Sequence, residues 1–179
     1  MKQRYDTLDI RIIHRPAELN ADGSGKHERF TVDFLVNGQS LYELLSAHRF
    51  DLVGRFSQDA QAWNEESANI FLKKQSADLE NGRIMLYVCP ECGDIGCGAI
   101  TVTIIKSDNS YTWTEFGYEN NYDPQMMDLD SYRAIGPFRF QFDEVSRKIR
   151  TRPESSIRRP SSGIRSGRVP CPTSCGLQG

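Results

Sequence analysis

The chain has 179 residues, of which 38% are hydrophobic, including 9 Phe, 7 Tyr and 2 Trp. This composition suits one domain of ordinary size with a real core, and no apolar run approaches the roughly 18 residues of a membrane span. The net charge of −2 is unevenly distributed: residues 151–179 carry +4, which leaves 17 basic and 23 acidic residues in 1–150. The net negative charge of residues 1–150 repels a phosphate backbone, so a nucleic acid is an unlikely partner and a basic protein is favoured.

The N-terminus and the cysteine count both bear on the cellular compartment. The opening segment MKQRYDTLDIRII lacks the apolar stretch of a secretory signal, because charges interrupt it every few residues. The chain has 5 cysteines, and an odd number does not fit a simple disulfide framework. We therefore expect a cytoplasmic protein with reduced thiols and no membrane partner.

The first elements are predicted from period-two alternation. Leu8, Ile10 and Ile12 alternate with charged residues, which is the pattern of a half-buried strand. Pro16 ends this strand, and the polar, glycine-containing segment 18–28 is predicted to be a loop.

A second alternating strand is predicted over 29–36, followed by an Asn-Gly turn. Ser40 and Glu43 then match a capping box, in which both side chains satisfy exposed backbone N–H groups at the start of a helix. The apolar stripe of this helix includes His48, which we expect to pack in the core or at its boundary.

The middle of the chain is predicted to hold one helix and three strands. The helix lies within 57–75 and is capped by Asp59. Residues 84–88 are apolar at every position, which predicts a strand covered on both faces. Alternating strands follow over 100–104 and 111–116.

The C-terminal third begins with residues 117–131, which are polar and aromatic without a period and are predicted to form a long loop. Phe138, Phe140 and Phe142 then alternate with polar residues as one more strand, and residues 143–150 have the pattern of a short helix.

These elements predict an α+β fold: a mostly antiparallel β-sheet of about five to seven strands, with two or three short helices packed on one face. Residues 1–150 are predicted to be a single α+β domain. Residues 151–179 form a basic tail of Pro, Ser, Gly and Arg that has too few apolar side chains to offset its ordering entropy, so we expect it to be disordered.

The segment Cys89-Pro-Glu-Cys92-Gly has the form of a metal knuckle, and Cys97 follows in a C-x2-C-x4-C pattern. A structural zinc ion is held by four ligands in a tetrahedron, so these three cysteines are candidate zinc ligands that need a fourth. The candidates for that fourth ligand are His14, His27, His48, Cys171, Cys175 and, more weakly, Asp94.

Two other interpretations of the same cysteines stay open. Cys89 and Cys92 could be the attacking and resolving thiols of a thiol-disulfide oxidoreductase, as CxxC pairs are when a helix N-terminus lowers one thiol pKa. No strong helix signal follows the motif, and Glu91 and Asp94 would raise a thiolate's pKa, which disfavours this chemistry. The three thiols could also be purely structural.

The segment 115–131 gathers acids and aromatic residues and could be an interaction surface for a basic protein partner, since tyrosine gives contact area at small entropic cost. Its alternative is an ordinary solvated loop whose aromatic rings pack against the sheet edge. No serine-nucleophile elbow, phosphate-binding glycine loop or HExxH motif occurs in the sequence.

Three segments resemble an uncharacterised group of small bacterial proteins: YVCPECGDIGCGAIT from Tyr87 to Thr101, WTEFGY from Trp113, and GPFRF from Gly136 to Phe140. The resemblance covers about 30–150 and implies a bacterial, cytoplasmic protein. It implies no particular activity, because the group has none assigned. Together with the motifs, it leads us to expect a non-enzymatic binding or regulatory module, immunity-like in character, whose cysteine hairpin binds zinc. The alternative is the small oxidoreductase that uses the CPEC motif.

Overall fold

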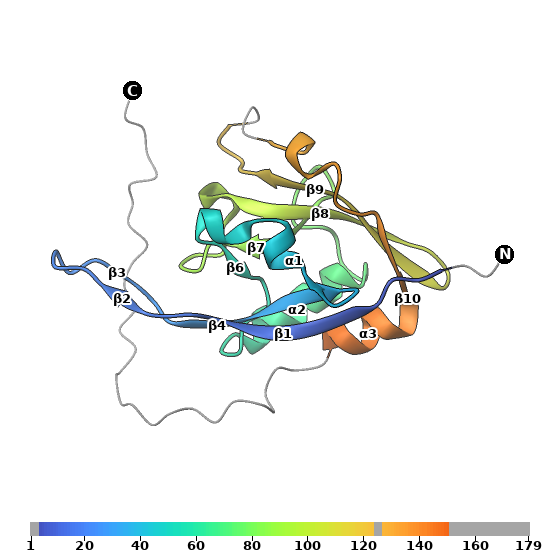
Figure 1. Ribbon diagram of the computed structural model, residues 1–179, viewed down its shortest axis with the longest axis horizontal. Helices are drawn as coiled ribbons and strands as arrows, with labels where there is room; N and C mark the ends of the chain where they lie inside the picture. Colours follow the sequence, from blue (N-terminus) through green and yellow to red (C-terminus); the bar gives the residue numbers. More distant parts are fainter. Residues whose placement is uncertain (1–3, 124–126, 151–179) are drawn as a thin grey trace.

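Two antiparallel sheets lie on opposite sides of one hydrophobic core in the computed structural model, which describes residues 4–123 and 127–150 (Figure 1). The expected α+β class with mostly antiparallel strands is confirmed. The predicted disorder of 151–179 falls outside the described residues.

The first sheet has the strand order β1-β4-β5, and β1 pairs with β4 along its full length, from Leu8 opposite Val36 to Arg15 opposite Arg29. The segment predicted as a polar loop contains a second small hairpin, because Asn20, Asp22 and Ser24 close its turn with hydrogen bonds. The bounds are β1 (Leu8–Arg15), β2 (Glu18–Leu19), β3 (Gly25–Lys26), β4 (Arg29–Val36) and β5 (Gln39–Ser40).

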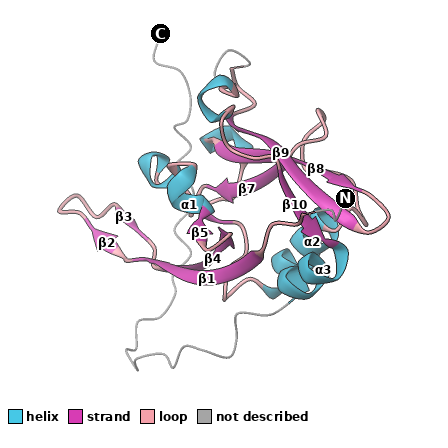
Figure 2. Cartoon of the chain, turned by 45° about the vertical axis from the view of Figure 1, so that its right-hand side comes forward, coloured by secondary structure: helices cyan, strands magenta, loops and turns pink. Residues whose placement is uncertain are grey.

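The second sheet has the order β10-β9-β8-β7-β6 and curls over the core (Figure 2). The strands predicted over 84–88, 100–104 and 111–116 are confirmed, and all five residues of β7 are buried, as expected for a strand covered on both faces. The strand predicted from Phe138 through Phe142 ends at Gln141, because Phe142 already begins α3. The prediction of a loop from residue 117 is wrong at its start, because Gly117, Tyr118 and Glu119 continue β9 by pairing with β8. The bounds are β6 (Val53–Gly54), β7 (Ile84–Val88), β8 (Ala99–Lys106), β9 (Ser110–Glu119) and β10 (Phe138–Gln141).

The helices are short. α1 follows its N-cap residue Ser40, whose Oγ accepts a hydrogen bond from the N–H of Glu43 at 3.1 Å, and it lasts a single turn. It ends because Ser46 adopts a left-handed conformation with φ of 52°, so His48 lies in a following 3-10 turn with half of its side chain exposed. The prediction that His48 packs in the core or at its boundary is therefore wrong.

α2 and α3 lie side by side, with α3 against β1 (Figures 1 and 2). α2 begins one residue later than predicted, with Ala60 rather than Asp59 at its N-cap position. The helical bounds are α1 (Leu41–Leu44), η1 (Ala47–Phe50), α2 (Gln61–Phe71), η2 (Ile95–Cys97), η4 (Asp130–Tyr132) and α3 (Phe142–Arg150). In the described part of the chain, no helix has both the length and the apolar character needed to cross a bilayer.

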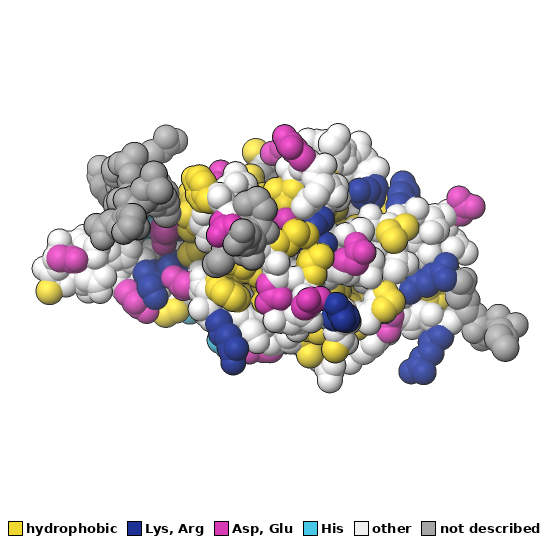
Figure 3. All heavy atoms as spheres, turned by 90° about the horizontal axis from the view of Figure 1, so that it is seen from above, with side chains coloured by type: hydrophobic (Ala, Val, Ile, Leu, Met, Phe, Trp, Pro, Cys, Tyr) yellow, Lys and Arg dark blue, Asp and Glu magenta, His cyan; other side chains and the backbone are white. Residues whose placement is uncertain are grey.

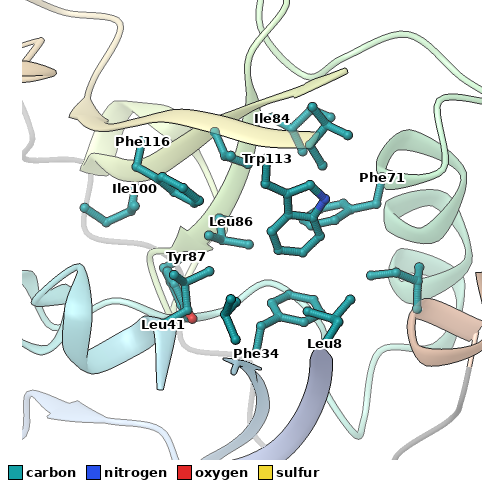
Figure 4. Close-up of a cluster of buried hydrophobic side chains, with 14 of the residues drawn as sticks. Leu8, Phe34, Leu41, Phe71, Ile84, Leu86, Tyr87, Ile100, Trp113 and Phe116 are labelled. Carbon is teal, nitrogen blue, oxygen red and sulfur yellow. The ribbon is translucent and has the colours of Figure 1, made fainter. Parts of the chain in front are cut away.

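The core is aromatic at its centre (Figure 4). Trp113 of β9 is fully buried and makes edge-to-face contacts with Phe34 at 5.1 Å, Phe71 at 5.8 Å and Phe140 at 5.4 Å between ring centroids. These rings come from the first sheet, from α2 and from the second sheet, so one cluster holds the layers together.

A buried polar network joins the two sheets beside this cluster. The Tyr87 hydroxyl donates to the fully buried Asp33 carboxylate at 2.7 Å, and Arg11 donates to the same carboxylate from β1 at 2.8 Å. Burial, followed by the neighbouring Asp33 charge, raises the pKa of Tyr87 well above its ordinary value.

Candidate metal centre

The loop between β7 and β8 brings the three predicted cysteines together. The sulfur atoms of Cys89, Cys92 and Cys97 all lie within 4.8 Å of one another, and those of Cys92 and Cys97 are 3.5 Å apart. Cys89 is half-buried, whereas Cys92 and Cys97 are exposed. The three sulfurs are therefore close enough to hold one metal ion.

Backbone geometry at the glycines produces this convergence. The N–H of Gly93 donates to the carbonyl of Cys89 at 3.0 Å, which closes the knuckle, and Gly93 has a φ of 67° that other residues rarely adopt. Asp94 then caps the 3-10 turn η2 by accepting from the N–H of Gly96, and this turn carries Cys97 back toward the first two cysteines.

No fourth metal ligand joins these sulfurs within the described ranges, because the cluster consists of the three cysteines alone. Asp94 is engaged as the cap of η2, and the tail cysteines Cys171 and Cys175 lie outside the described residues. Each predicted histidine instead contacts a carboxylate: His14 with Glu28, His27 with Glu91 and His48 with Glu43.

Glu91, inside the knuckle, anchors the cysteine loop to the first sheet. Arg15 donates to its carboxylate at 2.9 Å, His27 contacts it, and Arg29 donates to the neighbouring carbonyl of Pro90 at 2.8 Å. Burial alone would raise the pKa of Glu91, but the hydrogen bonds from His27 and Arg15 outweigh it and lower the pKa. Glu91 is therefore not an isolated negative charge beside the thiols, because Arg15 of β1 and Arg29 of β4 both lie within ion-pair distance of its carboxylate.

The Cys97 thiol is not poised as a thiolate. Burial raises the pKa of Cys97, and the neighbouring Cys92 and Cys89 raise it further, because a second negative charge beside a first is unfavourable. A divalent cation reverses this effect, since its charge stabilises several thiolates at once. The arrangement therefore favours metal binding over an unassisted nucleophile.

The cysteine loop and the aromatic residues of the segment 115–131 lie together on one surface, although they are separated in the sequence. The Tyr118 hydroxyl lies so close to Gly98 that a Cβ there would come within 2.1 Å of it, and the Tyr122 ring is within 2.6 Å of the equivalent position at Gly96. Phe50, which the sequence did not single out, stacks on Tyr118 at 4.4 Å between centroids. We call Phe50, Tyr118 and Tyr122 the aromatic face.

The acids predicted within 115–131 are partly buried in the core and partly accessible to solvent. Glu119 is buried and ion-paired with Arg83, so it does not belong to any interaction surface. Asp130 pairs with the nearby Arg133, and Asp128 accepts hydrogen bonds from Ser131 that lower its pKa, so it stays ionised. Hydrophobic and acidic side chains are intermingled on the β9 side of the molecule (Figure 3).

Comparison with protein-family models, with curated proteins and with solved structures found no match for this chain. Its function is therefore inferred from the geometry and chemistry of the site.

Proposed function

We propose that the protein is a non-enzymatic binding module in which Cys89, Cys92 and Cys97 hold one zinc ion. The observation that carries this proposal is the convergence of three sulfurs within 4.8 Å at the end of the central hairpin. Thiolates are soft ligands that favour zinc over hard cations such as magnesium and calcium, and zinc has no redox chemistry of its own. The ion would fix the loop that supports the aromatic face.

The function of the module would be to bind a basic protein through the aromatic face and the acids beside it. Tyr122 is 69% exposed and Phe50 is 43% exposed, and with Tyr118 they group beside the cysteine loop. Grouped exposed apolar side chains, unlike single ones, are typical of interaction sites. Asp123 and Asp128 follow Tyr122 in the sequence and carry the sign that complements a cationic partner. The resemblance to small bacterial proteins adds a cytoplasmic setting, in which the thiols stay reduced and available to the metal.

The oxidoreductase alternative rests on the CxxC pair of Cys89 and Cys92. The 3-10 turn after the motif weighs against it, because this turn is too short to supply a helix dipole that would lower a thiol pKa. Measuring the alkylation rates of the two thiols separates the hypotheses. Catalysis through this pair requires at least one thiol that reacts faster than free cysteine.

Metal content tests the zinc site directly. We expect the full chain, purified in reducing buffer, to contain stoichiometric zinc, and we expect Cys92→Ser to lose it because an exposed ligand is removed without disturbing the core. We expect the Cys171→Ser, Cys175→Ser double variant to keep its zinc, and loss of zinc from it would assign the fourth ligand to the tail. Metal-free wild-type protein with three freely reactive thiols in the loop would rule the site out.

Binding to a synthetic peptide of alternating lysine and phenylalanine tests the aromatic face. We expect salt-sensitive binding, which Tyr122→Ala weakens about tenfold because exposed aromatic anchors dominate such interfaces. Asp108→Asn, an exposed acid in the turn between β8 and β9, is the control and should leave the affinity unchanged. Equal affinity of wild type and Tyr122→Ala, measured by fluorescence anisotropy, would contradict this assignment.

A further inference from the structure

Cys92 and Cys97 are more exposed than the third cysteine, Cys89, and metal binding by itself does not require this difference. Both are exposed, and their sulfur atoms are 3.5 Å apart, whereas Cys89 is half-buried. A disulfide needs about 2.05 Å between sulfurs, so the two atoms must approach by roughly 1.5 Å. Rotation of the two exposed side chains provides part of this approach, and a shift of the backbone between them, which includes Gly93 and Gly96, provides the rest.

We propose that Cys92 and Cys97 are an oxidation site that an oxidant of the hydroperoxide class converts into a disulfide, and that this disulfide and the bound metal exclude each other. The second half of this proposal rests on the proposed zinc site. The first half requires only the two sulfurs and the oxidant.

The chemistry balances in two steps. The Cys92 sulfur attacks a peroxide oxygen, the O–O bond breaks, and a sulfenic acid forms on Cys92 while the other oxygen leaves as water after taking the thiol proton. The second sulfur then attacks the sulfenic sulfur, the S–S bond forms, and the S–O bond breaks to release a second water. Each sulfur is oxidised by one electron, hydrogen peroxide takes up both, and the bound cation leaves because two of its three thiolates are gone.

This oxidation would be transmitted to the aromatic face. Gly96 lies between Cys92 and Cys97 and packs under the Tyr122 ring, and Gly98 immediately after Cys97 packs under Tyr118. Closing the disulfide moves the backbone beneath both rings, because there is no space for it to shift without displacing them. Oxidation would therefore release the metal and change the surface that we assign to the partner.

The test uses the zinc-loaded full chain, titrated with hydrogen peroxide after removal of reductant. A chromogenic chelator measures zinc release, and digestion on the N-terminal side of aspartate separates the peptide 78–93 from the peptide 94–107. A bond from Cys97 to Cys92 or to Cys89 joins these two peptides, and the Cys89→Ser variant leaves only the first of these bonds possible. We expect joined peptides in the wild type and in Cys89→Ser, and their loss in Cys92→Ser and in Cys97→Ser. Zinc release should follow disulfide formation, and reductant with added zinc should reverse both.

The outcomes separate the two proposals. Absence of zinc before oxidation overturns the metal site, whereas joined peptides in metal-free Cys89→Ser would still support the oxidation site. Joined peptides that disappear in Cys89→Ser would show a Cys89–Cys97 bond and overturn it. Zinc-loaded protein that forms a Cys89–Cys92 bond, or only sulfinic acid, overturns the inference while leaving the metal site intact. A Cys92–Cys97 bond in protein that retains its zinc overturns the mutual exclusion.

Discussion

Chelation of the metal is expected to lower the midpoint of thermal unfolding of the full chain by roughly 10 °C. An ion that binds only the folded state stabilises it by about 4 kcal/mol when its free concentration is about 1,000 times its Kd, and a domain of this size shifts by about 2–4 °C for each kcal/mol. The fold should survive, because the main core between the sheets is built without the cysteine loop. The measurement is differential scanning calorimetry with and without chelator.

Cys92→Ser is the matched variant for this experiment. Since Cys92 is exposed, the serine hydroxyl meets water and brings no burial penalty of its own. We expect this variant to unfold at the midpoint of the chelated wild type and to show no response to added zinc. A wild-type midpoint that chelator leaves unchanged would contradict a stabilising metal.

Replacement of Glu119 with alanine is expected to lower the free energy of unfolding by about 3–5 kcal/mol, because it leaves a buried guanidinium without its counter-ion. Arg83 donates to Glu119 at 2.8 Å, Asn81 donates to the same carboxylate at 3.0 Å, and Thr101 donates to it as well. The side chains of Arg83 and Glu119 are only 5% and 9% exposed. Urea unfolding monitored by tryptophan fluorescence gives the value.

Two comparisons make this prediction specific. Glu115→Ala removes an acid of the same segment that is exposed, and surface changes of this kind usually alter stability by less than about 0.5 kcal/mol. The double variant Arg83→Met, Glu119→Leu removes both charges and should recover most of the loss, since an apolar pair of similar volume can replace a buried ion pair. Equal free energies of unfolding for Glu119→Ala and Glu115→Ala would contradict the burial of Glu119.

Local order along the chain was predictable to a large extent. Alternation located β1, β4 and β8, and the capping box located the start of α1, because these signals depend on neighbouring residues only. The length of α1 was not predictable in this way. It depends on Ser46, which adopts a left-handed conformation that no sequence motif marks, and this turn moves His48 out of line with the apolar stripe.

The convergence of Cys89, Cys92 and Cys97 followed from spacing, since proline and glycine close a short loop whatever surrounds it. The surroundings of that loop depend on contacts between distant residues. Arg15 meets Glu91 across 76 residues of sequence, and Tyr118 and Tyr122 reach the loop only because β9 pairs with β8.

The sequence by itself therefore determined the strand pattern, the α+β class and the grouping of three thiols, because each follows from periodicity or from spacing within a few residues. Only the tertiary structure decided which charges are compensated. It buried Glu119 against Arg83 and joined the aromatic face to the cysteine loop. The physical reason is that electrostatic compensation and side-chain contact depend on distance in space, and chain order does not encode that distance until the sheets have paired.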